Sequence, residues 1–179
     1  MLNFNEETLA ENVIYNGKIF QLMSNTVRLP NQRITTRDII NHPGAVALLP
    51  IHNNDIILVR QYRYAINQVT LELPAGTLER GEDPRECAHR ELMEETGYSA
   101  TNLEKLFNCY LAPGYSSERV TMFLATGLSK HQQDPDEDEF IQVETVTLLD
   151  AVDMIHRNQI VDTKTIAGIL YFKYNKLDL

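Results

Sequence analysis

The chain has 179 residues, of which 25 are acidic and 16 basic, so its formal net charge is −9. This charge argues against a nucleic-acid-binding protein, which usually carries a basic face, and no apolar run approaches the length that would span a bilayer. The hydrophobic share of 43% is enough for a globular core. Two cysteines are too few for a disulfide framework, and residues 1–12 do not resemble a signal peptide, so we expect a soluble cytoplasmic protein.

The N-terminal segment, residues 1–41, is predicted to be small and rich in β-structure. Its first dozen residues are polar and are expected to be loosely ordered. Apolar residues then alternate over Val13–Pro30 around a turn signal at Asn16–Gly17, and Asn31–Gln32 predicts a hairpin turn into a return strand over 33–42. Because the segment has little core of its own, we expect it to pack against the main domain or against a second subunit.

A main domain is predicted over residues 42–179, after the break in pattern at His42–Pro43–Gly44. Ala45–Ile51 is a continuous apolar run of the kind that forms a strand buried on both faces. Asn53–Asn54 predicts a turn. Further strands are expected over 55–64, 69–73, 103–111, 119–126 and 140–148, and two closing helices over 149–157 and 163–174. Strands interleaved with helices predict an α/β fold, in which helices cover a mixed sheet.

A third helix is predicted inside the stretch from Gly76 to Tyr98, with clear signals at both ends. Asp83 is placed to cap its N-terminus, with Glu86 three residues later, and Gly97 provides a C-terminal stop. Glu86, Arg90 and Glu94 follow one another at intervals of four residues. Arg90 is therefore expected to pair with both acids on the helix surface.

Acidic side chains crowd this helix. Glu91, Glu94 and Glu95 stand at i, i+3 and i+4, so they are neighbours on the helix surface, and Glu82 lies just before the helix. A charge run of this kind is usually a solvated face. Four carboxylates this close repel one another, however, unless a multivalent cation neutralises them. The cluster therefore favours a magnesium-dependent hydrolase of a phosphate-containing substrate.

The spacing of the fixed positions in this stretch resembles the signature of the Nudix hydrolase family. The matching residues are Gly76, Glu82, Arg90, Glu91, Glu94, Glu95 and Gly97. The last position of the signature is usually aliphatic and is Tyr98 here, a departure that concerns packing rather than metal binding.

The resemblance implies an α/β/α Nudix fold and hydrolysis of a diphosphate with magnesium or manganese. It implies that Arg90 orients a glutamate and that Glu82 supports the site from the preceding loop. A metal-bound water then becomes the nucleophile. The metal ligands that it implies are Glu91, Glu94, Glu95 and the carbonyl of Ala75, with Glu94 central to catalysis.

Much of the remaining chain is similar to the ADP-ribose pyrophosphatase branch of this family. The segments that carry the likeness are RDIINHPGAVALLPI, VRQYRY, LELPAGTLERGE, APGYSSE, DEDEFIQVE and VDTKTIAG. A proline 16 residues after the last glycine of the signature marks the branch, and Pro113 stands at that distance from Gly97. The residue before it is usually serine and is Ala112 here.

The branch implies where substrate binds. Arg63 matches a position that contacts the diphosphate, which suits the two parallel donors of a guanidinium, and Arg37 is a weaker candidate for the same role. Pro113 belongs to the substrate-binding half of the site, and Glu118 either lines that half or is a solvated loop acid. In this branch a glutamate on the matching loop closes over the site. The resemblance assigns that role to two residues of the acidic run at 134–139: Glu137 as catalytic base and Glu139 as a metal ligand.

The implied reaction converts ADP-ribose and water into AMP and ribose 5-phosphate, in a homodimer whose two-fold contact is built by residues 1–41. Two alternatives stay open. The substrate can be another nucleoside diphosphate sugar such as GDP-mannose. The chain can also be a non-catalytic module that senses ADP-ribose-like ligands, although such modules typically lose signature glutamates and this chain keeps every one.

Overall fold

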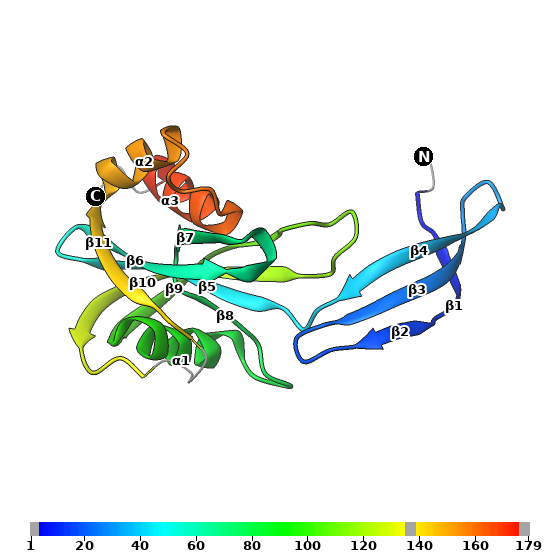
Figure 1. Ribbon diagram of the computed structural model, residues 1–179, viewed down its shortest axis with the longest axis horizontal. Helices are drawn as coiled ribbons and strands as arrows, with labels where there is room; N and C mark the ends of the chain where they lie inside the picture. The colour runs from blue at the N-terminus through cyan, green and yellow to red at the C-terminus, as the bar shows by residue number, and fades with distance from the viewer. Residues whose placement is uncertain (1–3, 135–138, 176–179) are drawn as a thin grey trace. The chain divides into compact units, whose positions relative to one another are not determined.

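The computed structural model describes residues 4–134 and 139–175, and the chain divides into two units (Figure 1). The first unit combines Met1–Gly44 with Tyr110–Arg119, and the second combines Ala45–Cys109 with Val120–Leu179. The segment around Pro113 therefore joins the N-terminal residues, although it is far from them in sequence. The pairing of Ile40 with Ser116 makes this connection.

The first unit contains a four-stranded antiparallel sheet. Its strands are β1 (Glu7–Ala10), β2 (Val13–Asn16), β3 (Gln21–Arg28) and β4 (Ile34–Asn41). β3 is the central strand. β4 pairs with one edge of β3 along its whole length, and β1 and β2 pair with the two halves of the opposite edge of β3. The predicted hairpin before the return strand is confirmed, with Gln32 at a positive φ of 68°. The expectation of loose order over the first dozen residues is wrong at β1.

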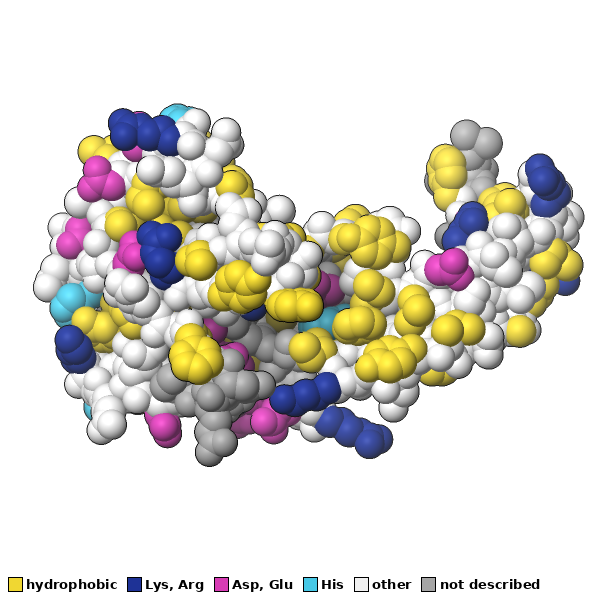
Figure 2. Space-filling view, viewed as in Figure 1, with side chains coloured by type: hydrophobic (Ala, Val, Ile, Leu, Met, Phe, Trp, Pro, Cys, Tyr) yellow, Lys and Arg dark blue, Asp and Glu magenta, His cyan; other side chains and the backbone are white. Residues whose placement is uncertain are grey.

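Few apolar side chains of the first unit are buried. Within the part of this unit that the structure describes, Met23 and Val27 are the buried hydrophobic residues. Large apolar side chains are exposed over the same sheet, as Figure 2 shows; they include Phe4, Val13, Ile14, Tyr15, Ile19 and Ile34. The unit therefore has only a small core of its own.

The second unit is built on a seven-stranded mixed sheet with the order β11-β6-β5-β10-β9, to which β7 adds beside β6 and β8 beside β5. β5 and β10 run parallel, whereas β6 pairs antiparallel with β11, β5 and β7, and β8 pairs antiparallel with β5. The strands are β5 (Ala45–His52), β6 (Asp55–Arg63), β7 (Gln68–Glu72), β8 (Ala75–Thr77), β9 (Tyr98–Tyr110), β10 (Arg119–Lys130) and β11 (Gln142–Thr147). A 3₁₀ turn, Tyr64–Ile66, follows β6.

Helices cover both faces of this sheet. Figure 1 shows α1 (Pro84–Thr96) on one side, and α2 (Leu148–His156) and α3 (Thr163–Asn175) on the other. Val46 and Leu48 of β5 pack with Leu92 of α1 in one buried cluster. Because neighbouring residues of a strand face opposite sides, Ala47 and Leu49, also buried, face the other layer. The predicted α/β/α arrangement and the doubly buried strand are confirmed. None of the helices in the described ranges is long and apolar enough to cross a membrane.

Candidate active site

Helix α1 has the ends that the sequence predicts. The Asp83 side chain accepts a hydrogen bond of 2.8 Å from the backbone N–H of Arg85, which would otherwise lack a partner at the helix start. Gly97 has a φ of +69° and donates its N–H to the carbonyl of Met93. Glycine adopts this left-handed conformation without strain, so the helix ends there. α1 therefore begins and ends where the sequence predicts.

Arg90 ties the loop before α1 to the acidic face of the helix. Its Nε and Nη2 donate to the two oxygens of Glu82 at 3.0 and 3.1 Å. Its Nη1 donates to Glu91 at 2.7 Å and to Glu94 at 3.0 Å. Of the two pairs predicted by spacing, Arg90–Glu94 forms. Among the described residues, Arg90 forms no ion pair with Glu86; its other carboxylate partners are Glu82 and Glu91.

Glu91 lies directly against the backbone of Gly76. A Cβ atom at position 76 would occupy the space of the Glu91 carboxylate. Glycine is therefore required here so that a buried carboxylate and the turn after Ala75 can approach each other. This contact brings the backbone that precedes α1 next to the acidic face of the helix.

Glu91 and Glu95 are buried and mutually repelling. Burial raises the pKa of Glu91 to about 7, with further contributions from the charges of Glu94 and Glu139. Burial also raises the pKa of Glu95 to about 8, against the effect of the Ala75 N–H, which donates to its carboxylate at 2.9 Å. Arg90 lowers the pKa of Glu91 and the charge of Arg63 lowers that of Glu95, but burial outweighs both effects. Carboxylate oxygens are the ligands that Mg²⁺ prefers.

The donor set thus fits a divalent cation in chemistry, although the side chains are engaged with protein partners. Glu91 and Glu94 accept from Arg90, and Glu95 accepts from the backbone of Ala75. Over residues 4–134 and 139–175, no three His, Cys, Asp or Glu side chains are arranged to hold a metal ion. The metal roles of these glutamates and of the Ala75 carbonyl remain predictions.

Arg63 ends β6 and forms a bidentate pair with Glu72 of β7. Its Nε and Nη2 lie 2.8 and 2.7 Å from the two carboxylate oxygens. These hydrogen bonds raise the pKa of Arg63, burial opposes them, and the charges of Glu72, Glu95 and Asp162 also raise it. Arg63 is therefore within electrostatic range of the acidic cluster on α1, and 42% of its side chain remains exposed.

The other predicted substrate residues belong to the first unit. Arg37 donates to the carboxylate of Glu6 at 3.0 and 2.7 Å. Pro113 and Glu118 lie in the segment Tyr110–Arg119 of that unit, and the backbone N–H of Glu118 donates to Ser116 Oγ at 3.2 Å. Their roles in substrate binding remain predictions.

Of the two predicted loop residues, Glu137 lies outside the described residues. Glu139 is described and exposed, and its charge contributes to the raised pKa of both Glu91 and Glu95. It is therefore within electrostatic range of the cluster, as a further metal ligand needs to be.

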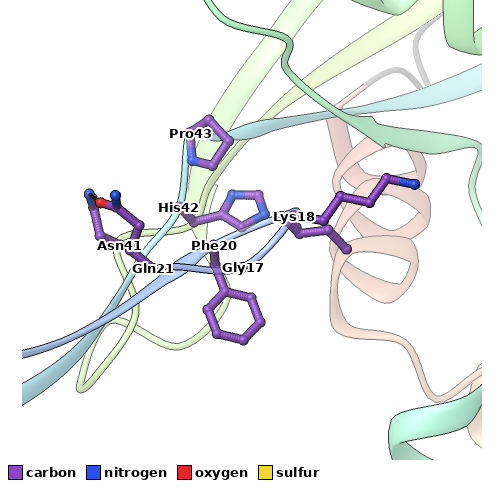
Figure 3. Close-up of a pocket in the computed structure, with 8 residues that line it drawn as sticks. Gly17, Lys18, Phe20, Gln21, Asn41, His42 and Pro43 are labelled. Carbon is purple, nitrogen blue, oxygen red and sulfur yellow. Dashed lines mark hydrogen bonds between the residues drawn. The ribbon is translucent and has the colours of Figure 1, made fainter. Parts of the chain in front are cut away.

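A hollow in the first unit contains none of the predicted site residues (Figure 3). It has a volume of about 250 Å³ and lies where the turn between β2 and β3 meets the end of β4. Its walls include Lys18, Phe20, Gln21, Asn41, His42 and Pro43. The sequence places these residues on predicted strands, turns and the break at His42–Pro43–Gly44, and gives none of them a functional role.

Sequence reasoning also missed the partners of Arg63. Glu72 lies in the segment LELPAG and Lys164 in VDTKT, both of which resemble the branch, yet neither residue has a predicted role. Lys164 binds Glu72 across 92 positions of sequence, so no local spacing could have joined them.

The family model described as the NUDIX domain matches residues 41–167, and the chain belongs to this family. It is 42% identical to the ADP-ribose pyrophosphatase of Bacillus subtilis (strain 168), over 97% of this chain and 95% of the relative. It is 40% identical to the methanol dehydrogenase activator of Bacillus methanolicus, over 95% and 94% of the two chains. The GDP-mannose pyrophosphatase of Yersinia enterocolitica is 34% identical over 70% of each. In fold, the chain is similar to a solved ADP compounds hydrolase, with a TM-score of 0.85, 21% identity and coverage of 97% and 96%.

Proposed function

We propose that this Nudix hydrolase cleaves the diphosphate of ADP-ribose, giving AMP and ribose 5-phosphate. The observation that carries the proposal is the buried acidic face of α1, held by Arg90 against the Gly76 turn. The substrate follows from the near full-length likeness to a bacterial ADP-ribose pyrophosphatase. Relatives named GDP-mannose pyrophosphatase are less similar: one is 34% identical over 70% of this chain, and another is 29% identical over 95% of it.

The residues proposed to hold magnesium are Glu91, Glu94, Glu95, Glu139 and the Ala75 carbonyl. When bound there, the metal would neutralise the diphosphate and lower the pKa of a coordinated water. The chain itself brings these carboxylates together, and two of them, Glu91 and Glu95, are buried. Arg90 contributes by its bonds to Glu91 and Glu94, while its bidentate pair with Glu82 anchors it to the loop.

Arg63 is proposed to bind the substrate diphosphate. Its guanidinium is partly exposed, is held by Glu72, and feels the charge of Glu95 on α1. Glu137 is proposed as the base that takes a proton from the attacking water, and Arg37, Pro113 and Glu118 as further substrate contacts. These four assignments rest on the resemblance to the ADP-ribose pyrophosphatase branch.

The activity is tested by incubating the purified protein with ADP-ribose and Mg²⁺ and separating the products. AMP and ribose 5-phosphate in equal amounts are expected, and chelation of the metal should abolish both. Absence of AMP at high enzyme concentration would overturn the substrate assignment. A parallel comparison of kcat/KM for ADP-ribose and GDP-mannose separates the two substrate candidates.

The same assay distinguishes an enzyme from a sensing module by whether AMP is produced. A sensing module would bind ADP-ribose without producing AMP. The complete set of signature residues, with Glu82, Glu91 and Glu94 all bonded to Arg90, favours the enzyme.

We also propose that residues 1–41 form the contact of a homodimer and that the enzyme works in the cytoplasm. The exposed apolar side chains of the N-terminal sheet support the dimer, because a sheet that buries few residues of its own is stabilised by a second apolar surface. The cytoplasmic assignment is supported by two cysteines that form no disulfide, Cys87 and Cys109.

A further inference from the structure

The first turn of α3 reaches a buried carboxylate at the end of β7. Lys164 donates from Nζ to Glu72 and, at 3.0 Å, to Asp162. Glu72 is 2% exposed and Lys164 7% exposed. Thr70 Oγ1 donates to the same carboxylate at 2.6 Å. Although burial alone would raise it, hydrogen bonds from Arg63 and the charge of Lys164 lower the pKa of Glu72 to about 2.

Arg63 occupies the exposed end of this group. The order Arg63–Glu72–Lys164–Asp162 alternates in sign, so the four formal charges cancel. Buried ion pairs of this kind are often no more stabilising than apolar residues of the same volume, because both charges lose their water. These ion pairs instead fix the orientation of the Glu72 carboxylate, because rotation of that carboxylate would leave the buried Lys164 ammonium unpaired.

The same turn of α3 also binds the backbone that leads to the acidic cluster. Leu73 donates its N–H to Thr165 Oγ1 at 2.8 Å, and Thr165 is itself held by Asp162. Gly168 allows α3 to lie close to Leu73, since a Cβ there would come within 2.7 Å of the Leu73 Cδ1. The chain then passes to Ala75, whose N–H binds Glu95. One helix turn therefore fixes both Arg63, through Glu72, and the strand end before Gly76.

We propose that Lys164, supported by Asp162, is a positioning residue for hydrolysis: through Glu72 it orients the Arg63 guanidinium to receive the substrate diphosphate. The inference rests on the proposed function in one respect, the role of Arg63. Nothing in the signature of the family points to it. Lys164 is buried and does not itself touch substrate.

Lys164 holds Glu72 in place, and Glu72 in turn holds Arg63 in an orientation that leaves donors for the substrate. A guanidinium has five N–H donors, and the bidentate pair with Glu72 uses two of them, which leaves three for phosphate oxygens. An arginine side chain that is already oriented loses less freedom when substrate binds. Without Lys164, Thr70 alone would hold the Glu72 carboxylate from inside the protein, and substrate binding would have to order both Glu72 and Arg63.

The test is a double-mutant cycle in kcat and KM with Lys164→Met and Arg63→Gln. We expect Lys164→Met to raise KM roughly tenfold and to change kcat less than about twofold, because orientation affects binding of the diphosphate. In the Arg63→Gln background the same substitution should have no further effect on KM. Lys164→Arg, which keeps the charge, should restore most of the affinity.

A matched control is available on the same strand. Arg60 of β6 forms a bidentate pair with Glu144 of β11, away from Glu72. Glu144→Gln removes one charge from an ion pair of similar form, and its KM should equal that of the wild type. Melting temperatures are recorded for every variant, since a purely structural role would lower stability alone.

Two results would overturn the inference. One is a Lys164→Met protein with a lowered melting temperature and an unchanged KM. The other is a double variant in which the increases in KM caused by Lys164→Met and by Arg63→Gln multiply. That result would show that Lys164 does not act through Arg63. If Lys164→Met fails to fold, the variant Glu72→Gln/Lys164→Met removes both buried charges together and enters the cycle in its place, with the same expected rise in KM.

Failure of the proposed function is recognised separately. It appears in the wild type, as an absence of AMP from ADP-ribose. The cycle is then run with whichever nucleoside diphosphate sugar the wild type hydrolyses fastest, because the inference concerns the diphosphate and not the attached sugar.

Discussion

Close packing between Gly76 and Glu91 restricts which residue can stand at position 76. The carboxylate of Glu91 lies where any larger residue at position 76 would place its Cβ. The requirement for glycine at this turn was visible in the sequence only as part of a motif. Its physical cause, a buried acid pressed against the backbone, needed the fold.

Gly76→Ala is expected to reduce both stability and activity. The added methyl group forces Glu91 or the turn to move, and overpacking of this kind costs about 1–3 kcal/mol. Thermal unfolding and ADP-ribose hydrolysis measure the two effects. Gly114→Ala provides the control in stability, because no atom lies within 4 Å of a Cβ there; an equal loss in both variants would contradict the explanation.

Glu72 predicts a dependence of stability on pH. Its pKa is lowered from 4.5 to about 2, so its contribution is present above about pH 4.5 and is lost as the pH falls towards 2. The shift corresponds to about 3 kcal/mol. In denaturant titrations, the difference in unfolding free energy between wild type and Glu72→Gln should be large at pH 7 and shrink at pH 3. A difference that does not vary with pH would argue against a paired, ionised Glu72.

Sequence spacing predicts ion pairs within one helix but not pairs between distant segments. Arg90 and Glu94 are four residues apart on one helix, and their pair was predicted and forms. Glu82 and Glu91 share the same arginine, although Glu86 was the expected second partner. Lys164 and Glu72 meet only because α3 packs across the sheet, so their pair was beyond sequence reasoning.

At the scale of elements, α1 was predictable because its end signals are local. Asp83 and Gly97 act through hydrogen bonds and backbone angles within their own turns. β1 was missed for the opposite reason. The sequence of Glu7–Ala10 has no clear alternation, and its extended form comes from pairing with β3 and from the ion pair between Glu7 and Arg28.

Asp83→Ala should destabilise α1 without removing any residue of the acidic cluster. Loss of the cap leaves the N–H of Arg85 without its acceptor, at a cost of about 1 kcal/mol. The change is measured as a fall in melting temperature. Asp83→Asn, which keeps a capping oxygen, should stay close to the wild type; equal losses in the two variants would contradict the capping role.

In the whole molecule, the mixed sheet of the second unit and the helices that cover it could be predicted, because buried runs such as Ala45–Ile51 and the helix signals are strong. The order of the strands could not be predicted. The join between the N-terminal residues and Tyr110–Arg119 could not, since it depends on a contact between distant segments at Ile40 and Ser116. The N-terminal sheet leaves apolar residues exposed that a second copy is proposed to cover.

Ile14→Glu is expected to weaken the proposed dimer. Ile14 is 57% exposed in the sheet, so a charge is tolerated in the monomer but is costly to bury between two copies. Sedimentation velocity over a range of concentrations should show a dimer for the wild type and a shift towards monomer for the variant. Leu149→Glu, at a site 75% exposed on α2, should not change the association state. A monomeric wild type would contradict the proposal.

The acidic face of α1 is proposed to carry out metal-dependent hydrolysis of a diphosphate, and a substitution of Glu94 tests this proposal. The measurement is kcat/KM for ADP-ribose in Mg²⁺, compared among wild type, Glu94→Gln and Glu86→Gln, an exposed acid on the first turn of the same helix. We expect kcat/KM to fall roughly 100-fold or more in Glu94→Gln at an unchanged melting temperature, and to stay unchanged in Glu86→Gln. Full activity in a folded Glu94→Gln protein would contradict it.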